Sequence, residues 1–319
     1  MTISDKPIAP SAPETGNRKR RSFLRWFKVR RLRKDLLTAF LFLLPSLVVF
    51  GVFVYYALGF NFYLSFTSWN FLTPAKEVIG FDNYTRLFDS SVFWGALKNT
   101  VYFAAGSVSL SIVIGLFLAV LLNQKLPVRG LFRTIIFSPY VTTTAAIALL
   151  WLWIFQPEFG LINIGLQFLG IDGPNWLSDT NWAMPALIIM NVWRNTGYVM
   201  VIFLAGLQNV PGELYEAAEI DGAGAFRKFW NVTLPLLSPT TFFITVTSLL
   251  NAFNTFDQVQ VMTRGGPAGA TTVLNYFIYE QAFVNFRAGY ASAASTIMFL
   301  ILLAITVFQL VASKRWVHY

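Results

Sequence analysis

The sequence has no cysteine and only one histidine, His318, among its 319 residues. Thiol chemistry, Cys/His metal sites and histidine-based acid–base catalysis therefore lack their usual residues. Charged residues are also scarce, at 12% of the chain, whereas apolar residues make up 55% and aromatic residues 17%. This composition is typical of a membrane protein, and it predicts neither a metal site nor an enzyme active site.

The positive charge is concentrated at one end of the chain. The formal net charge is +9, and residues 1–35 contain eleven basic and three acidic side chains, which accounts for +8 of it. The remainder is nearly neutral, so we expect a basic tail beside membrane lipid and no nucleic-acid partner. Residues 22–34 fit an interfacial anchor or, equally well, a disordered tail at the headgroups.

Six apolar stretches are long enough to cross a bilayer core of about 30 Å as helices. They are residues 36–60, 101–122, 135–155, 183–207, 240–262 and 291–311. The first is too long for a signal peptide and no cleavage site follows it, so we expect it to be retained. The prediction is an all-α membrane protein with six transmembrane helices. A transmembrane domain, 36–315, lies between the tail and a short C-terminus, 316–319.

The distribution of lysine and arginine predicts the orientation, because these residues accumulate on cytoplasmic flanks. Placing both termini in the cytoplasm gives 18 lysine and arginine residues on the cytoplasmic side and 5 on the outer side. Most of the difference comes from the tail. We therefore predict that both termini are cytoplasmic.

The fourth apolar stretch has a polar face. At 100° per residue, four of its central residues fall on one side of a helix, and these are Asn191, Arg194, Asn195 and Tyr198. A central arginine costs roughly 2.5–3.5 kcal/mol in a bilayer. This face is therefore expected to contact protein or water.

The fifth stretch has a second polar stripe at helical spacing, formed by Ser248, Asn251, Thr255 and Gln258. Asp257 is expected on the other side of that helix. Two such stripes predict a shared polar cavity. The alternative is interhelical hydrogen bonding, with Arg194 paired to Asp257 as a structural ion pair.

The cytoplasmic segment 208–239 predicts two short helices joined by a turn. Pro211 suits the start of the first helix, which runs to Asp221. Gly222 and Gly224 supply the turn. The second helix, 225–232, is expected to end before Pro235, because the residue preceding a proline avoids the helical region.

The first of these helices has features of a docking surface. Ala217 and Ala218 allow close approach of another backbone, and Glu216 offers a carboxylate. The alternative is a plain surface connector. Motifs here and elsewhere resemble those of ABC-importer permeases of the carbohydrate type, whose cytoplasmic EAA loop has this spacing. The matching segments are Glu216-Ala-Ala-Glu-Ile-Asp-Gly-Ala223, Leu234-Pro235-Leu236, Gly80-Phe-Asp-Asn-Tyr84, Asn99-Thr100, Arg129-Gly-Leu-Phe-Arg133, Gly265-Gly-Pro267 and Ala291-Ser-Ala293.

The resemblance implies a maltose-type permease core in a bacterial or archaeal cytoplasmic (inner) membrane, coupled to a cytoplasmic ATPase homodimer. It assigns the coupling contact to Glu216, Ala217, Ala218, Asp221 and Gly222. The chain has no phosphate-binding loop of the Walker type. ATP and Mg²⁺ are therefore expected on the partner ATPase, with no cofactor in this chain.

The resemblance also implies a substrate site, because maltose-type permeases hold sugar on three core helices. Alignment by the Pro-Tyr, Asn-x-Trp and Phe-Asn-x-Phe motifs points to Tyr140, Thr144, Asn191, Asn195, Ser248, Asn251 and Thr255, with Arg194 beside them. Arg194 and Asn195 replace smaller, uncharged residues of the maltose-type pattern. Arg194 need not bind a phosphate, because hydroxyl-rich sugars accept its hydrogen bonds equally well. A neutral oligosaccharide is the leading expectation, and glycerol-phosphate or another polyol derivative is the second.

Further partners follow from the same resemblance: a second homologous permease subunit and an extracytoplasmic solute-binding protein. Composition alone would also fit an ion-coupled secondary transporter, and the EAA-like loop argues against it. A membrane-bound transferase or hydrolase would need paired carboxylates, a metal site or an activated nucleophile. None of these is visible in the sequence near the spans.

Overall fold

The computed structural model describes residues 35–124 and 127–316. The chain divides into two compact units, residues 1–60 and 61–319. The described part of the first unit belongs to an apolar helix, Asp35–Leu64, which includes the π-helical segment η1 (Gly51–Tyr56) and ends with α2 (Ala57–Leu64). Residues 1–34 of the basic tail, which was predicted at residues 1–35, lie outside the described residues.

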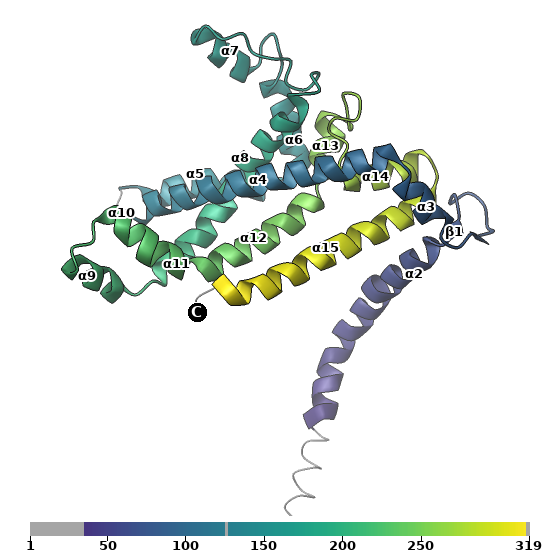
Figure 1. Ribbon diagram of the computed structural model, residues 1–319, viewed down its shortest axis with the longest axis horizontal. Coiled ribbons are helices and arrows are strands. Elements are labelled where there is room, and N and C mark those ends of the chain that lie inside the picture. The colour runs from purple at the N-terminus through teal and green to yellow at the C-terminus, as the bar shows by residue number, and fades with distance from the viewer. Residues whose placement is uncertain (1–34, 125–126, 317–319) are drawn as a thin grey trace, which may run out of the picture. The chain divides into compact units, whose positions relative to one another are not determined.

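The second unit is a bundle of long apolar helices (Figure 1). Its main members are α4 (Ser91–Asn123), α8 (Ala183–Gln208), α12 (Ser238–Phe253) and α15 (Ala288–Trp316). Glycines allow α4 to approach α8 closely, since a Cβ on Gly115 would lie 2.5 Å from a methyl group of Val199. Small residues at such contacts are how membrane helices pack without a strong hydrophobic driving force.

Four helices of the described chain are long and apolar enough to cross a membrane, and two bent helix pairs raise the number to six. The four are Asp35–Leu64, Ser91–Asn123, Ala183–Gln208 and Ala288–Lys314. The predicted class, an all-α membrane protein with six transmembrane helices, is therefore confirmed. The first bent pair, Arg129–Val141 with Thr144–Ile154, covers the third predicted stretch. The second, Ala225–Leu236 with Ser238–Phe253, meets at 62° and contains the first part of the fifth.

The third stretch was expected to be one helix, and the structure corrects this. It consists of α5 (Arg129–Val141) and α6 (Thr144–Ile154), which meet at 101°. Pro139 lies inside α5, where its missing N–H and its ring disturb the preceding turn. Thr142 and Thr143 then adopt extended backbone conformations, which ends the helix within the apolar stretch.

The fifth stretch is also interrupted. α12 ends at Phe253, and the short helix α13 (Asp257–Met262) follows after a break. Asn254 stabilises the end of α12 by donating its side-chain amide to the Leu250 carbonyl at 2.9 Å. A single stripe along one straight helix, as predicted from the spacing, is therefore not what the structure contains.

The segment 208–239, predicted to be cytoplasmic, contains the expected helix–turn–helix with two corrections. α9 (Gly212–Ile220) is followed by Gly222 in the left-handed region, with φ of +74°. Gly224 instead has an ordinary φ of −68°. The second helix continues through Pro235, as α10 (Ala225–Lys228), η2 (Phe229–Thr233) and α11 (Leu234–Leu236). The π-helical turn η2 makes room for the proline, because its hydrogen bonds reach back five residues.

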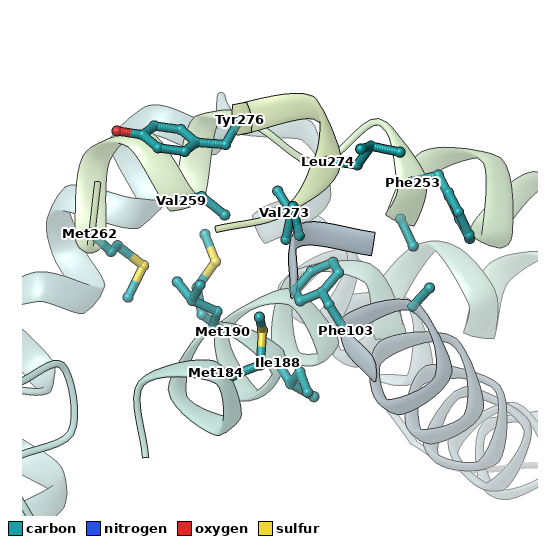
Figure 2. Close-up of a cluster of buried hydrophobic side chains, with 14 of the residues drawn as sticks. Phe103, Met184, Ile188, Met190, Phe253, Val259, Met262, Val273, Leu274 and Tyr276 are labelled. Atoms are coloured by element: carbon teal, nitrogen blue, oxygen red, sulfur yellow. The ribbon is translucent and has the colours of Figure 1, made fainter. Parts of the chain in front are cut away.

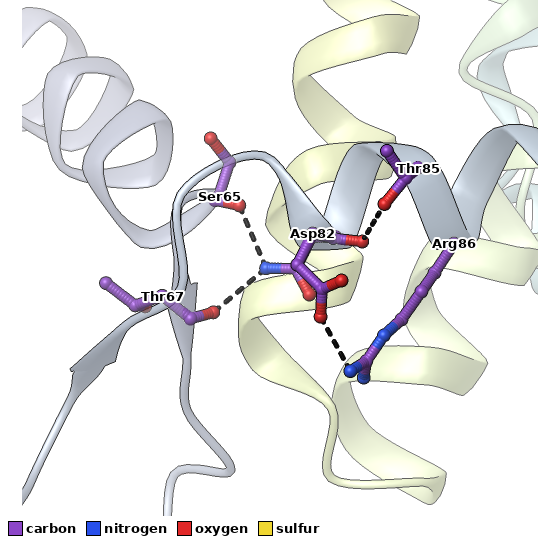
Figure 3. Close-up of polar contacts among 6 residues, drawn as sticks. Ser65, Thr67, Asp82, Thr85 and Arg86 are labelled. Carbon is purple, nitrogen blue, oxygen red and sulfur yellow. Dashed lines mark hydrogen bonds and ion pairs between the residues drawn. The ribbon is translucent and has the colours of Figure 1, made fainter.

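A small hairpin forms the start of the second unit. Strand β1 (Thr67–Ser68) pairs antiparallel with β2 (Glu77–Val78), and helix α3 (Asp82–Phe88) follows. The Asn83 side-chain amide donates to the carbonyls of Ser65 and Thr67, each at 2.9 Å. Figure 3 shows Ser65 and Thr67 beside the start of α3, where Asp82 pairs with Arg86. A Cβ on Gly289 of α15 would overlap the Thr67 carbonyl, so the hairpin and α15 are in direct contact.

The hydrophobic core lies between α4, α8 and the segment from α13 to α14 (Leu274–Tyr279) (Figure 2). Phe103, Met190 and Leu274 are among its buried side chains. Asn99 of α4 donates to the carbonyls of Gly269 and Thr272, which holds the glycine-rich loop 263–272 against the core. The remaining helical elements are α7 (Leu161–Phe168) and the π-helical η3 (Glu280–Val284).

Candidate functional site

A polar cavity of about 320 Å³ lies among the helices of the second unit. Side chains from α4, α5, α6, α8, α12 and α13 form its walls. All eight residues predicted to bind substrate line it, namely Tyr140, Thr144, Asn191, Arg194, Asn195, Ser248, Asn251 and Thr255. The structure thus brings these residues together, while their contact with a substrate remains a prediction.

The polar face of α8 forms one wall of the cavity. Asn191, Arg194, Asn195 and Tyr198 all line it, as their helical spacing predicted. Within this face the Asn195 amide donates to the Asn191 side-chain oxygen at 3.0 Å. The two amides therefore hold each other in position and keep further donors and acceptors free for a ligand.

Arg194 is held by the break in the third stretch. Its guanidinium donates to the carbonyls of Tyr140 and Thr142 at 3.3 and 3.4 Å, and its Cζ lies 5.3 Å from the centre of the Tyr140 ring. These carbonyls are available because the end of α5 leaves its last acceptors without helical partners. The break and the arginine therefore stabilise each other.

Arg194 forms no ion pair with any residue of the described chain, because the two pairs found there join Arg86 to Asp82 and Lys228 to Glu219. Asp257 lines the same cavity. Its predicted position on the far side of the helix is wrong, because α12 ends before it and α13 starts in a new direction. The alternative of a structural Arg194–Asp257 pair is not realised in this structure.

Two tyrosines form an aromatic wall. The rings of Tyr140 and Tyr198 stack with their centres 4.7 Å apart and an angle of 18° between their planes. Gly197 makes this possible, because a Cβ at that position would overlap the carbonyl of Ile136 in α5. The glycine lets the two backbones approach and so places one ring over the other.

The residues of the fifth stretch reach the cavity from three local structures. Ser248 and Asn251 belong to α12, Thr255 lies in the break, and Gln258 belongs to α13. The break also adds Asn254 and Phe256 to the cavity wall. The polar character was predictable from the sequence, but the bend that turns all these residues to one space was not.

Ser107 and Ser111 of α4 also line the cavity, although neither was predicted from the sequence. Both are buried, and neither hydroxyl has a hydrogen-bond partner among the residues that the structure describes. Their spacing of four residues within an otherwise apolar stretch was the available signal.

The residues predicted to contact an ATPase lie on α9 and the turn after it. Glu216 and Ala217 are exposed, and Ala218 is half-buried. Asp221 ends α9, and Gly222 forms the turn. The Lys228 ammonium contacts the Glu219 carboxylate at 2.7 Å, and this hydrogen bond lowers the pKa of Glu219. The coupling role of this loop remains a prediction.

Comparison with known proteins identifies the family. Residues 111–318 match the model of the binding-protein-dependent transport system inner membrane component. The chain belongs to this family. It is therefore a permease subunit of an ABC transporter, a transport subunit and not an enzyme, and it is embedded in the inner membrane. The alternative of an ion-coupled secondary transporter is not favoured.

The sequences of individual relatives align with most of this chain. The permease is 39% identical over 275 residues to the Probable ABC transporter permease protein YurN of Bacillus subtilis (strain 168), covering 85% of this chain and 94% of that protein. It is 35% identical to the sulfoquinovosyl glycerol transport system permease protein SmoG of Agrobacterium fabrum (strain C58 / ATCC 33970), with coverage of 85% and 89%.

A solved structure shares the fold. It is a chain of the bacterial alginate ABC transporter in complex with an alginate pentasaccharide-bound periplasmic protein. The TM-score is 0.76 at 26% identity, and the match covers 90% of the permease and 96% of that chain.

Proposed function

We propose that the permease translocates a carbohydrate, most simply an oligosaccharide, delivered by an extracytoplasmic binding protein. The observation that carries this proposal is the cavity, whose walls combine side-chain amides, hydroxyls and the stacked rings of Tyr140 and Tyr198. Sugar hydroxyls both donate and accept hydrogen bonds, and amides and hydroxyls match them in both roles. The sugar-related substrates named for SmoG and the alginate transporter support the same class.

The energy source in this proposal is a partner ATPase homodimer that binds ATP and Mg²⁺. Closure of the ATPases would be transmitted through Glu216, Ala217, Ala218, Asp221 and Gly222 to the helices around the cavity. A second homologous permease subunit would complete the path. Both termini would face the cytoplasm of a bacterial or archaeal cell, as the distribution of basic residues indicates.

An anionic polyol such as glycerol-phosphate is the second candidate. The observation that favours it is the Arg194 guanidinium, which lines the cavity and has no carboxylate partner among the described residues. Two of its hydrogen bonds, however, already go to the carbonyls of Tyr140 and Thr142. A neutral oligosaccharide therefore remains the first candidate.

The test uses the complete transporter in proteoliposomes. The binding protein is screened by thermal shift against neutral and acidic saccharides of one to five units and against glycerol 3-phosphate, and uptake of the compound with the largest shift is measured. The expected result is saccharide uptake that requires ATP and stops with vanadate. A shift with glycerol 3-phosphate alone, or uptake that continues in vanadate, would contradict the proposal.

A Glu216→Ala variant tests the coupling surface. Glu216 is exposed on α9, so the substitution should change the free energy of unfolding by no more than about 0.5 kcal/mol. The melting temperature should therefore be nearly unchanged. Uptake and substrate-stimulated ATP hydrolysis should fall together, because the contact with the ATPase is weakened. Glu213→Ala, an exposed glutamate in the first turn of the same helix, is the matched control. Full uptake and ATPase activity in Glu216→Ala would show that this side chain does not transmit the closure.

A further inference from the structure

Helix α4 contributes two serines to the wall of the cavity. Ser107 and Ser111 lie one helical turn apart, and each is only 2% exposed. The oxygen of each hydroxyl is buried without a hydrogen-bond partner in residues 35–124 and 127–316. A buried hydroxyl without a hydrogen bond lowers the stability of the folded state. Such groups are rare in folded proteins, because buried polar groups are ordinarily paired.

Other buried hydroxyls in the same bundle are satisfied within their own helix. Thr100, Thr196 and Thr296 donate to the carbonyl four residues earlier at 2.7, 2.7 and 2.8 Å. The same acceptors are within reach of a serine in a helix, yet Ser107 and Ser111 do not use them. Their hydroxyls remain unpaired where they border the cavity.

A third unpaired group comes from another element. Gln258 of α13 lines the cavity at 2% exposure, and its side-chain amide nitrogen has no hydrogen-bond partner in the described part of the chain. Unpaired polar groups from α4 and α13 therefore border one space. Buried polar groups are ordinarily paired with protein, water or a ligand, and the cavity is the space from which such a partner can come.

We propose that Ser107, Ser111 and Gln258 form a hydroxyl-binding subsite for the transported carbohydrate, on α4 and α13, in addition to the eight residues predicted on the third to fifth stretches. Each serine hydroxyl can donate and accept, and the amide nitrogen donates, which suits neighbouring hydroxyls of a sugar ring. The inference rests on the proposed function. The serine oxygens are covered in this conformation, so the subsite engages when the helices move apart during transport.

The absence of cysteine from the chain permits a direct test of access. Ser107→Cys and Ser111→Cys place one thiol each on the cavity wall, and Ser109→Cys on the exposed side of α4 is the matched control. The complete transporter in nanodiscs is treated during ATP turnover with a cationic methanethiosulfonate reagent. Positions 107 and 111 should react, and the saccharide selected in the uptake experiment should slow both reactions about tenfold. The Ser109→Cys control should stay unreactive with and without the saccharide, because the exposed side of a membrane-spanning helix excludes a charged reagent.

Alanine variants test the contribution to transport. The Ser107→Ala/Ser111→Ala double variant should raise the saccharide concentration for half-maximal uptake about tenfold, as expected for lost hydrogen bonds to a ligand. Its melting temperature without saccharide should be unchanged or higher, because two unpaired hydroxyls are removed. Ser109→Ala should change neither quantity, and Gln258→Leu should weaken uptake in the same direction as the double variant.

The outcomes separate this inference from the proposed function. Unprotected or unreactive thiols at 107 and 111, or unchanged uptake in the double variant, would overturn the subsite while vanadate-sensitive saccharide uptake continued. A lower melting temperature in the double variant would show that the hydroxyls are paired within the protein, and would also overturn it. Failure of the unmodified transporter to take up any saccharide would contradict the proposed function itself.

Discussion

Glycines determine how closely the helices approach one another around the cavity. Gly115 brings α4 against Val199, and Gly197 brings α8 against the backbone of α5 at Ile136 and Phe137. At Gly115 an added Cβ would lie 2.5 Å from a methyl group of Val199 and 3.2 Å from the Met200 backbone nitrogen. At Gly197 the neighbouring atoms belong to the backbone and cannot rotate away, so this position is the less tolerant of the two.

Gly197→Ala should destabilise the permease by about 1–3 kcal/mol, the range for overpacking a close contact. It should also separate the Tyr140 and Tyr198 rings and weaken uptake. Thermal unfolding in detergent measures the first effect. Gly95→Ala is the control, because a Cβ added to Gly95 in α4 would have no atom within 4 Å. Alanine there should stabilise by about 0.5–1 kcal/mol. Equal melting temperatures for the two variants would show that α5 does not constrain residue 197.

The residue-level prediction of the cavity succeeded where it depended on local spacing. Helical spacing placed Asn191, Arg194, Asn195 and Tyr198 on one face, and α8 is straight enough for all four to line the cavity. The predicted position of Asp257 was wrong because the prediction assumed a continuous helix. Ser107 and Ser111 were missed because a serine in an apolar helix usually bonds its own backbone, and only tertiary structure shows otherwise.

The breaks are the main feature of the helical elements that the sequence left undetermined. Pro139 signals a disturbance, but proline is tolerated in many membrane helices when neighbours satisfy the backbone. At α5 the neighbour is Arg194, from a helix more than fifty residues further along the chain. A feature stabilised by so distant a residue cannot be located from local propensity.

The stability of the helical hairpin formed by α9 and α10 should depend on pH through Glu219. Its carboxylate accepts a hydrogen bond from Lys228, which lowers its pKa in the folded state. The pair therefore stabilises the hairpin above the ordinary glutamate pKa of about 4.3, and this contribution is lost as the pH falls through the lower folded-state value. Because the pair is exposed, the effect should be small.

Hydrogen exchange of residues 212–236, compared between the native chain and Glu219→Gln at equal pH, measures this contribution. The variant should exchange faster at pH 7 and at the same rate as the native chain at the lowest pH. A difference that persists in acid would assign the effect to packing and not to charge.

At the scale of the whole molecule, the number of spans was predictable and their continuity was not. Apolar length identifies a span whether it is straight or bent, so six stretches correspond to four long helices and two bent pairs. Orientation depends on charges outside the helices. Much of that signal lies in residues 1–34, outside the described chain.

A topology experiment tests the orientation. Alkaline phosphatase fused after Tyr319 should be inactive and green fluorescent protein at the same position should fluoresce, because the C-terminus is expected in the cytoplasm. The control is alkaline phosphatase inserted after Gly170, in the segment between α7 and α8, where it should be active. Reversed activities would place the α9 hairpin on the outer side and remove the basis for coupling to an ATPase.

The contact between the β1–β2 hairpin and α15 has a mechanical consequence. The Gly289 N–H donates to the Trp69 carbonyl, and the absence of a side chain at Gly289 lets Thr67 sit directly against the helix. A rigid helix that is held at one end moves furthest at its other end. If the bundle rocks during each cycle, α15 would pivot about this corner and its end near Lys314 would travel furthest.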